Sequence, residues 1–297
     1  MRMHADQVDV AADAVARLVA AQFPQWRALP VRPVASHGTV NALFRLGDEV
    51  VVRLPLRPDD GAGMRESLRY EQDVARRFAA HTTVPVPEPL GLGEPGADYP
   101  GWWSAYRWIA GETADAADVA GSVAFARDLA GFVREVRGID TGGRGWDGRS
   151  RGGPLATRDA GVRTALRRSA ELVDVDAIAR VWDRCRDAAA PSGPDVWLHA
   201  DLMPGNLLVR PGRLAAVIDL GTACIGDPAV DLMPAWNLLS AGARAAFRDV
   251  LQIDDATWDR GRGWALLQAI VALPYYVDTN PSMAATARHT LAAVLES

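Results

Sequence analysis

The chain has 297 residues, 49% of them hydrophobic, and a formal net charge of −5. This length suffices for one large domain or two smaller ones. The mildly acidic balance, without a long run of basic residues, excludes a basic nucleic-acid-binding tail. No apolar stretch is long enough to span a bilayer, so neither nucleic acid nor a membrane is an expected partner.

Two residue types limit the possible chemistry. The two cysteines, Cys185 and Cys224, lie far apart and in no metal-binding spacing, which suits a reducing cytoplasm. All 32 basic residues are arginines. Without lysine, a P-loop of the G-x-x-x-x-G-K-[ST] type and Schiff-base chemistry are excluded, so a side chain that binds a nucleotide phosphate electrostatically must be arginine.

Strand patterns dominate roughly the first 110 residues. A helix is expected over residues 6–22, whose aspartates argue against a signal peptide. Residues 35–56 alternate and are rich in Val and Leu, with Gly47-Asp48 in the middle, which predicts a hairpin. Helical periodicity follows over 65–81, then a proline-rich extended stretch over 83–93 and a strand within 102–112.

The second part of the chain is mainly helical. Helices are expected over 118–138, 156–171 and 174–190, and again from about 228 to the end. A short β region with a Pro211-Gly212 turn lies between them, over 196–220. The Gly- and Arg-rich segment 142–153 is expected to be a loop, either a mobile connection or a loop on the substrate side. The chain is therefore expected to be α+β, with domains over 1–110 and 111–297.

The β region contains the spacing His199-x-Asp201-x-x-x-x-Asn206, and an apolar strand ends at Asp219. This is the spacing of a kinase catalytic loop followed by a metal-binding aspartate. Asp201 could accept a hydrogen bond from an acceptor hydroxyl, while Asn206 and Asp219 offer the hard oxygen ligands that Mg²⁺ prefers. A hairpin would hold Asn206 and Asp219 side by side. Alternatively, Asp201 and Asn206 are turn formers flanking Pro204-Gly205.

At these residues the sequence resembles the aminoglycoside phosphotransferase family of small-molecule kinases. The resemblance rests on HADLMPGN (199–206), IDLG (218–221) and above all GDPAVDL (226–232), and it covers roughly residues 30–240. It implies a protein-kinase-like two-lobed fold of the α+β class. A β-rich nucleotide-binding lobe would occupy 1–110. A mainly helical lobe with a small catalytic hairpin, the metal site and the acceptor pocket would occupy 111–297.

The resemblance implies roles for residues of the second lobe. Asp201 would be the catalytic base that orients the acceptor hydroxyl, and Asn206 and Asp219 would hold Mg²⁺. Two departures from the family pattern remove no catalytic group: Ala200 replaces the usual glycine, and Met203 stands where histidine is frequent. The residues expected to support the catalytic loop are His199, Asp227 and Asp231.

The first lobe would bind the nucleotide. Arg53 would grip its phosphates and pair with Glu71 on the following helix, where Glu66 is the competing partner; alternatively, Arg53 is a solvated strand residue. Gly38, Thr39 and Asn41 would belong to the loop over the triphosphate. The hinge whose backbone meets the base would consist of Arg107, Trp108 and Ile109.

The expected activity is Mg²⁺-dependent transfer of the γ-phosphate of ATP or GTP to a small hydroxyl-bearing acceptor, first of all an aminoglycoside-like antibiotic. Asp278 and Trp236 are the expected acceptor contacts. The alternatives are another acceptor (a macrolide, a homoserine- or choline-type amino alcohol, or a sugar) and a catalytically silent nucleotide-binding pseudokinase. The joint presence of Asp201, Asn206 and Asp219 argues against a catalytically silent module. The motif GDPAVDL, in place of the A-P-E segment of protein kinases, argues against a protein kinase.

Overall fold

The computed structural model describes residues 7–35 and 40–296. The chain divides into two compact units, one made of Met1–Ala80 and Pro85–Ala110, the other of His81–Val84 and Gly111–Ser297. Gly38 and Thr39, expected in the loop over the triphosphate, lie outside the described residues. Helices and strands are both well represented, which confirms the mixed α+β class.

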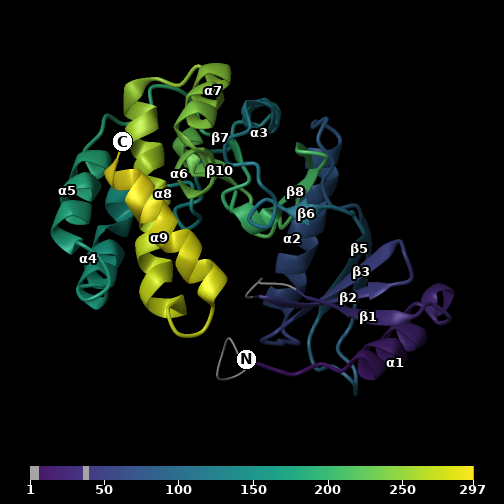
Figure 1. Ribbon diagram of the computed structural model, residues 1–297. Helices are drawn as coiled ribbons and strands as arrows, with labels where there is room; N and C mark the ends of the chain where they lie inside the picture. Colours follow the sequence, from purple (N-terminus) through teal and green to yellow (C-terminus); the bar gives the residue numbers. More distant parts are fainter. Residues whose placement is uncertain (1–6, 36–39, 297) are drawn as a thin grey trace. The chain divides into compact units, whose positions relative to one another are not determined.

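The first unit is built on a five-stranded antiparallel sheet with the order β1-β2-β3-β5-β4 (Figure 1). Residue Gly47 lies in the β2–β3 turn with a φ of 54°, a left-handed conformation that favours glycine. The expected hairpin is therefore present. The strands are β1 (Val31–Val34), β2 (Asn41–Leu46), β3 (Val50–Pro55), β4 (Pro89–Gly93) and β5 (Trp103–Arg107).

The two faces of this sheet bury different residues. Val52 and Leu54 of β3 belong to a core cluster that also contains residues of helix α1 (Ala12–Gln22). Arg53 lies between them in the sequence, so strand alternation places its side chain on the opposite face. There it meets Glu71 of helix α2 (Ala62–Ala79).

Helix α1 begins at Ala12 rather than near residue 6, so the helix expected over 6–22 is too long at its start. The N–H of Val8 donates a hydrogen bond to the carbonyl oxygen of Leu56 at 2.8 Å. The segment before the helix is thus paired with the chain that follows β3. A backbone donor used in this way is not available to an extended helix.

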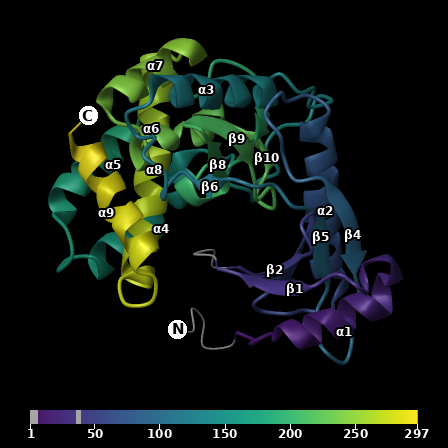
Figure 2. The same cartoon turned by 45° about the vertical axis from the view of Figure 1, so that its right-hand side comes forward.

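Most of the second unit is helical. Figures 1 and 2 show α8 and α9 lying side by side, and α8 also packs against α4, α5 and the short 3₁₀ helix η4. Helix α8 is buried on several sides, which makes it the centre of this unit. The helices are α3 (Val123–Arg137), α4 (Asp159–Arg168), α5 (Val175–Arg186), α6 (Pro234–Asn237), α7 (Ala241–Leu251), α8 (Asp255–Tyr276) and α9 (Pro281–Leu295), with 3₁₀ helices η1 (Pro24–Trp26), η2 (Leu155–Arg158), η3 (Pro204–Asn206) and η4 (Pro228–Leu232).

The β region of the second unit forms two small sheets. In one, β6 (Glu112–Thr113) pairs with β8 (Leu207–Arg210), which forms the expected hairpin with β9 (Arg213–Val217). In the other, β7 (Val196–Leu198) pairs with β10 (Cys224–Gly226). The segment 199–206 connects the two sheets. Within the described residues, none of the helices combines the length and apolar character needed to cross a membrane.

Candidate active site

His199 opens the loop that joins β7 to β8, and it is completely buried. Its Nδ1 atom accepts a hydrogen bond from the backbone N–H of Asp201 at 3.2 Å, and its Nε2 atom lies 3.1 Å from the carbonyl oxygen of Ile218. A carbonyl only accepts and a backbone N–H only donates. The ring is therefore the neutral tautomer with its proton on Nε2, and it ties the loop to the end of β9.

Asp231 holds the same loop from η4. One carboxylate oxygen accepts from the backbone N–H of His199 and the other from that of Ala200, both at 2.8 Å. The side chain is buried, and burial raises the pKa of its carboxyl while the two N–H donors oppose this rise. Asp231 thus sets the backbone position of the two residues that precede Asp201.

Ala200 adopts a φ of 64° and is completely buried. A residue with a Cβ atom pays a steric penalty of about 1 kcal/mol in this left-handed conformation, whereas glycine does not. This conformation gives a physical reason why the family pattern has glycine here. The alanine is held in it by the bond from its N–H to Asp231.

Asp201, the expected base, has a carboxylate with three side-chain partners. Its Oδ1 atom accepts from Arg151 Nη1 at 2.5 Å and from Gln268 Nε2 at 2.7 Å. Its Oδ2 atom lies 3.3 Å from Asn206 Nδ2, a longer and weaker contact. The side chain is 19% exposed. The oxygen with the weaker contact, Oδ2, is the better placed of the two to accept a further hydrogen bond.

Asn206 and Asp219 flank the β8–β9 hairpin, as expected. The carbonyl oxygen of Asn206 accepts from the N–H of Ile218 at 2.9 Å, immediately before Asp219. The amide nitrogen of Asn206 donates to the carbonyl oxygen of Asp201 at 2.9 Å, which leaves the amide oxygen to face another group. Asp219 has a φ of 67°, a conformation that aspartate tolerates better than most residues with a Cβ atom. The hairpin therefore brings the two residues to adjoining positions.

This pair fits a magnesium site by its donor chemistry. One neutral amide oxygen and one carboxylate are hard ligands, and Mg²⁺ is usually held by one or two carboxylates together with substrate phosphates and water. Among residues 7–35 and 40–296, no group of three or more His, Cys, Asp or Glu is arranged to hold a metal. A site with two protein ligands, completed by phosphates, is consistent with that finding.

Asp227 belongs to a buried ion pair beside the loop. Its carboxylate caps η4 by accepting from Ala229 N at 2.9 Å and pairs with Arg260 of α8 at 2.7 Å, with both side chains 6% exposed. The Arg260 guanidinium also donates to Thr257 Oγ1 at 3.1 Å. The pair joins α8 to the segment that carries Asp231.

In the first unit, Arg53 of β3 forms an ion pair with Glu71 of α2, and the two side chains are only 13% and 7% exposed. The ring of Tyr106 lies 5.5 Å from the Arg53 guanidinium. The competing Glu66 is exposed. Asn41 is the first residue of β2, opposite Pro55. Arg53 is therefore not a freely solvated strand residue.

The expected hinge has most of its backbone donors in use. Arg107 N donates to the carbonyl oxygen of Glu88 at 2.9 Å, and Trp108 N donates to that of Glu49 at 2.7 Å. The Arg107 side chain forms exposed ion pairs with the same two glutamates. Of the three predicted hinge residues, Ile109 is the one whose N–H lies outside these bonds.

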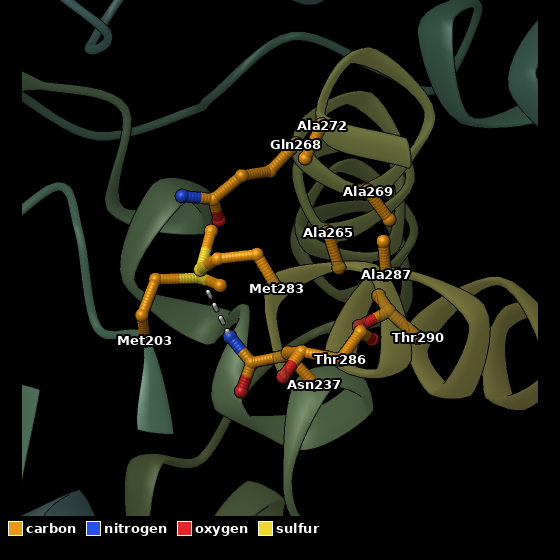
Figure 3. Close-up of a pocket in the computed structure, with 10 residues that line it drawn as sticks. All are labelled: Met203, Asn237, Ala265, Gln268, Ala269, Ala272, Met283, Thr286, Ala287 and Thr290. Carbon is orange, nitrogen blue, oxygen red and sulfur yellow. Dashed lines mark hydrogen bonds between the residues drawn. The ribbon is translucent and has the colours of Figure 1, made fainter. Parts of the chain in front are cut away.

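A small pocket opens beside Asp201. Figure 3 shows the alanines of α8 and α9 on one side of it, with the Gln268 carboxamide extending toward the side of Met203. Its volume, open solvent included, is about 240 Å³, less than the roughly 300 Å³ at which whole-ligand pockets begin. The lining residues are Met203, Asn237, Ala265, Gln268, Ala269, Ala272, Met283, Thr286, Ala287 and Thr290.

The two expected acceptor contacts lie elsewhere. Trp236 is completely buried, with its ring 4.6 Å from that of Trp258. Asp278 is exposed in the turn between α8 and α9 and does not line this pocket. These positions give no support to an acceptor role for either residue.

Arg151 and Gln268 are the site residues that sequence reasoning missed. Gln268 is a single polar residue in the apolar run WALLQAIVAL, which is a usable signal because a polar group in a buried helix needs a partner. Arg151 lies in the Gly- and Arg-rich segment 142–153, where nothing in the sequence separates it from Arg144 or Arg149.

Comparisons with known proteins identify the family of the chain. The model of the phosphotransferase enzyme family (APH) matches residues 30–264. A comparison with curated protein sequences gave no significant match. Several solved structures share the fold. The GDP complex of wild-type aminoglycoside 2'-phosphotransferase-IIIa is 16% identical with a TM-score of 0.69, covering 96% of this chain and 98% of that one.

Two further structures show the range of these relatives. The apoenzyme of macrolide 2'-phosphotransferase MphH from Brachybacterium faecium is 23% identical with a TM-score of 0.62, covering 95% of this chain and 97% of that one. A thermostable mutant of aminoglycoside phosphotransferase APH(4)-Ia, in complex with AMP-PNP and hygromycin B, is 19% identical with a TM-score of 0.65, covering 96% and 98%. Since the family model spans most of the sequence, the chain belongs to the phosphotransferase enzyme family, as its motifs indicated.

Proposed function

We propose that this phosphotransferase moves the γ-phosphate of ATP or GTP, with Mg²⁺, to a hydroxyl group of a small molecule. The observation that carries the proposal is the arrangement around the β8–β9 hairpin. Asp201, Asn206 and the residue before Asp219 are joined by hydrogen bonds of 2.9 Å. A carboxylate for the acceptor and two oxygen ligands for a metal thus lie on one short, firmly held segment.

In the proposed reaction, the acceptor hydroxyl donates a hydrogen bond to Asp201, which orients it toward the γ-phosphorus. The acceptor oxygen forms a bond to that phosphorus, the bond to the β–γ bridging oxygen breaks, the hydroxyl proton passes to Asp201, and the nucleoside diphosphate leaves. Asn206 and Asp219 would hold Mg²⁺, which neutralises phosphate charge when bound. Arg53, oriented by Glu71, would bind phosphate oxygens in its place on β3.

The acceptor class is the finer part of the proposal. The family resemblance suggests an aminoglycoside-like hydroxyl, and the similar solved structures are named as aminoglycoside and macrolide phosphotransferases. Both classes therefore belong in the test. We place the activity in the cytoplasm, where the two buried thiols would stay reduced.

The test is transfer of labelled phosphate from ATP and from GTP, with and without Mg²⁺, to aminoglycosides, macrolides, amino alcohols and sugar alcohols. Asp201→Asn should fold and bind nucleotide but lose about 10²–10⁴-fold in turnover, the usual contribution of a positioned base. Asp219→Ala should lose the Mg²⁺-dependent part of its nucleotide affinity. Near-normal turnover in the first variant, or Mg²⁺-enhanced nucleotide binding in the second, would contradict the assigned roles.

A further inference from the structure

Arg151 lies directly against the carboxylate of Asp201, the proposed base. Its Nη1 atom donates to Asp201 Oδ1 at 2.5 Å and to the carbonyl oxygen of Ala200 at 3.1 Å. The Arg151 side chain is 43% exposed, so it is accessible to solvent. The negative charge of Asp201 is therefore already balanced by a cation from this chain.

The loop that carries Arg151 is held by its own contacts. Asp147 Oδ1 accepts from the backbone N–H groups of Arg149 at 2.9 Å and Ser150 at 2.8 Å, and these bonds lower the pKa of the Asp147 carboxyl. The carbonyl oxygen of Ser150 accepts from the indole N–H of Trp146 at 3.1 Å and from Arg158 at 2.6 Å. Both the N–H and the carbonyl oxygen of Ser150, the residue before Arg151, are therefore hydrogen-bonded.

The residue after Arg151 is fixed too. The carbonyl oxygen of Gly152 accepts from Asp227 N at 2.9 Å. A Cβ atom on Gly226 would lie 2.3 Å from that oxygen, and one on Gly152 would lie 2.7 Å from the carbonyl oxygen of Ile225. Only glycines allow this approach of the two backbones. The segment 142–153, expected to be either a mobile connection or a loop on the substrate side, is held by hydrogen bonds on both sides of Arg151.

Gln268 and the pocket that it lines are neutral. Gln268 donates an amide N–H to the Oδ1 atom of Asp201, and the pocket beside it is lined by Met, Ala, Thr, Asn and Gln without a carboxylate among the described residues. Asn237 Oδ1, in the same lining, is a buried acceptor with no hydrogen-bond partner within the described part of the chain. A neutral acceptor of this kind suits a hydroxyl donor of the substrate.

These observations bear on the substrate class. An ammonium group next to the reacting hydroxyl would face the Arg151 guanidinium as well as the Asp201 carboxylate, and because these two are already paired, the site offers it no uncompensated negative charge. Among the described residues, the pocket lining has no carboxylate that would attract it either. We propose that Arg151 is a specificity-determining residue that selects acceptors without an ammonium group beside the reacting hydroxyl, with an apolar part against Met203 and Met283. This inference rests on the proposed phosphotransfer and narrows its acceptor away from polycationic aminoglycosides.

The test compares acceptors in which one hydroxyl is replaced by an ammonium group, with the position of the transferred phosphate determined so that both members are compared at the hydroxyl they share. Two matched pairs serve as probes: octyl glucopyranoside with its 2-amino-2-deoxy counterpart, and 1,2-octanediol with 2-amino-1-octanol. The wild-type protein should favour the uncharged member by tenfold or more in kcat/KM, mainly through KM. Arg151→Gln should reduce this preference to threefold or less, whereas Arg151→Lys, which keeps the cation, should retain most of it.

Arg149→Gln is the matched control, since it removes a guanidinium from the same loop without touching Asp201, and it should leave the preference unchanged. Equal use of both members by the wild-type protein, or an unchanged ratio in Arg151→Gln, would overturn the inference. So would Asp201-dependent transfer to kanamycin but to no uncharged probe. Nucleotide hydrolysis without acceptor is measured in parallel: if nucleotide is neither bound nor hydrolysed, the proposed function itself fails.

Discussion

The substitution Asp231→Asn tests whether the two hydrogen bonds that Asp231 accepts position the catalytic loop. Asparagine has nearly the same shape but only one side-chain oxygen, and its NH₂ group would face a backbone N–H of the loop. Either His199 N or Ala200 N would then be left without an acceptor in a buried position. An unpaired buried donor costs about 1–3 kcal/mol, and the remaining bond loses its charge assistance, worth about 1 kcal/mol.

The opposing effect is the removal of a buried carboxylate, whose ionised form is disfavoured by burial. The lost charge assistance and the gain from removing the buried carboxylate largely cancel. The unpaired N–H remains, so we expect Asp231→Asn to lower the free energy of unfolding by about 2 kcal/mol, the middle of the range for an unpaired buried donor. Turnover should fall by tenfold or more, because Asp201 follows Ala200 directly in the chain and depends on the position of its backbone.

Urea unfolding followed by tryptophan fluorescence measures the first effect, with an unchanged m-value as the sign that the unfolded state is the same. Asp118→Asn, at an exposed position in the turn before α3, is the matched control and should change stability by less than about 0.5 kcal/mol. A cost below about 1 kcal/mol for Asp231→Asn, or a cost equal to that of the control, would refute the reasoning.

Two other positions make simpler tests. Ala200→Gly should raise stability by about 0.5–1 kcal/mol with turnover retained, because glycine relieves the φ of 64°; a lower melting temperature would show that the alanine is not strained. Backbone hydrogen bonds lower the pKa of Asp147, so this carboxyl stabilises the folded loop above its unfolded pKa and the contribution is lost as pH falls through the folded value. The Ser150 amide resonance should follow this titration, with a midpoint below the ordinary aspartate value, and Asp147→Asn should abolish it.

The parts of the site that could be predicted from the sequence depend on short separations. Asp201 and Asn206 are five residues apart and the hairpin that leads to Asp219 is closed by a Pro-Gly turn, so local patterns suffice to bring the three together. The predicted beginning of α1 was wrong because it depends on a contact with a distant part of the chain. The N–H of Val8, which lies within the expected helix, donates to the carbonyl oxygen of Leu56, a partner that no local periodicity reveals.

The missed residues are separated from Asp201 by much longer stretches of chain. Arg151 is 50 residues before it and Gln268 is 67 residues after it. Their arrival at one carboxylate oxygen depends on the packing of the 142–153 loop against β10 and of α8 within the second unit. Neither contact has a signature in residue spacing, and no arginine of that loop is distinguished from its neighbours by sequence alone.

The two departures from the family pattern meet these missed residues. The carbonyl oxygen of Ala200 accepts the second hydrogen bond of Arg151, and Met203 lines the pocket that Gln268 borders. The substituted positions of the catalytic loop thus contact the residues that no motif predicted, Arg151 and Gln268, and both of these bind Asp201. The proposed metal ligands, Asn206 and Asp219, keep the family pattern. Because the positions that depart from the pattern contact residues around the proposed base and not the proposed metal ligands, we expect this chain to transfer the same group to a different class of hydroxyl.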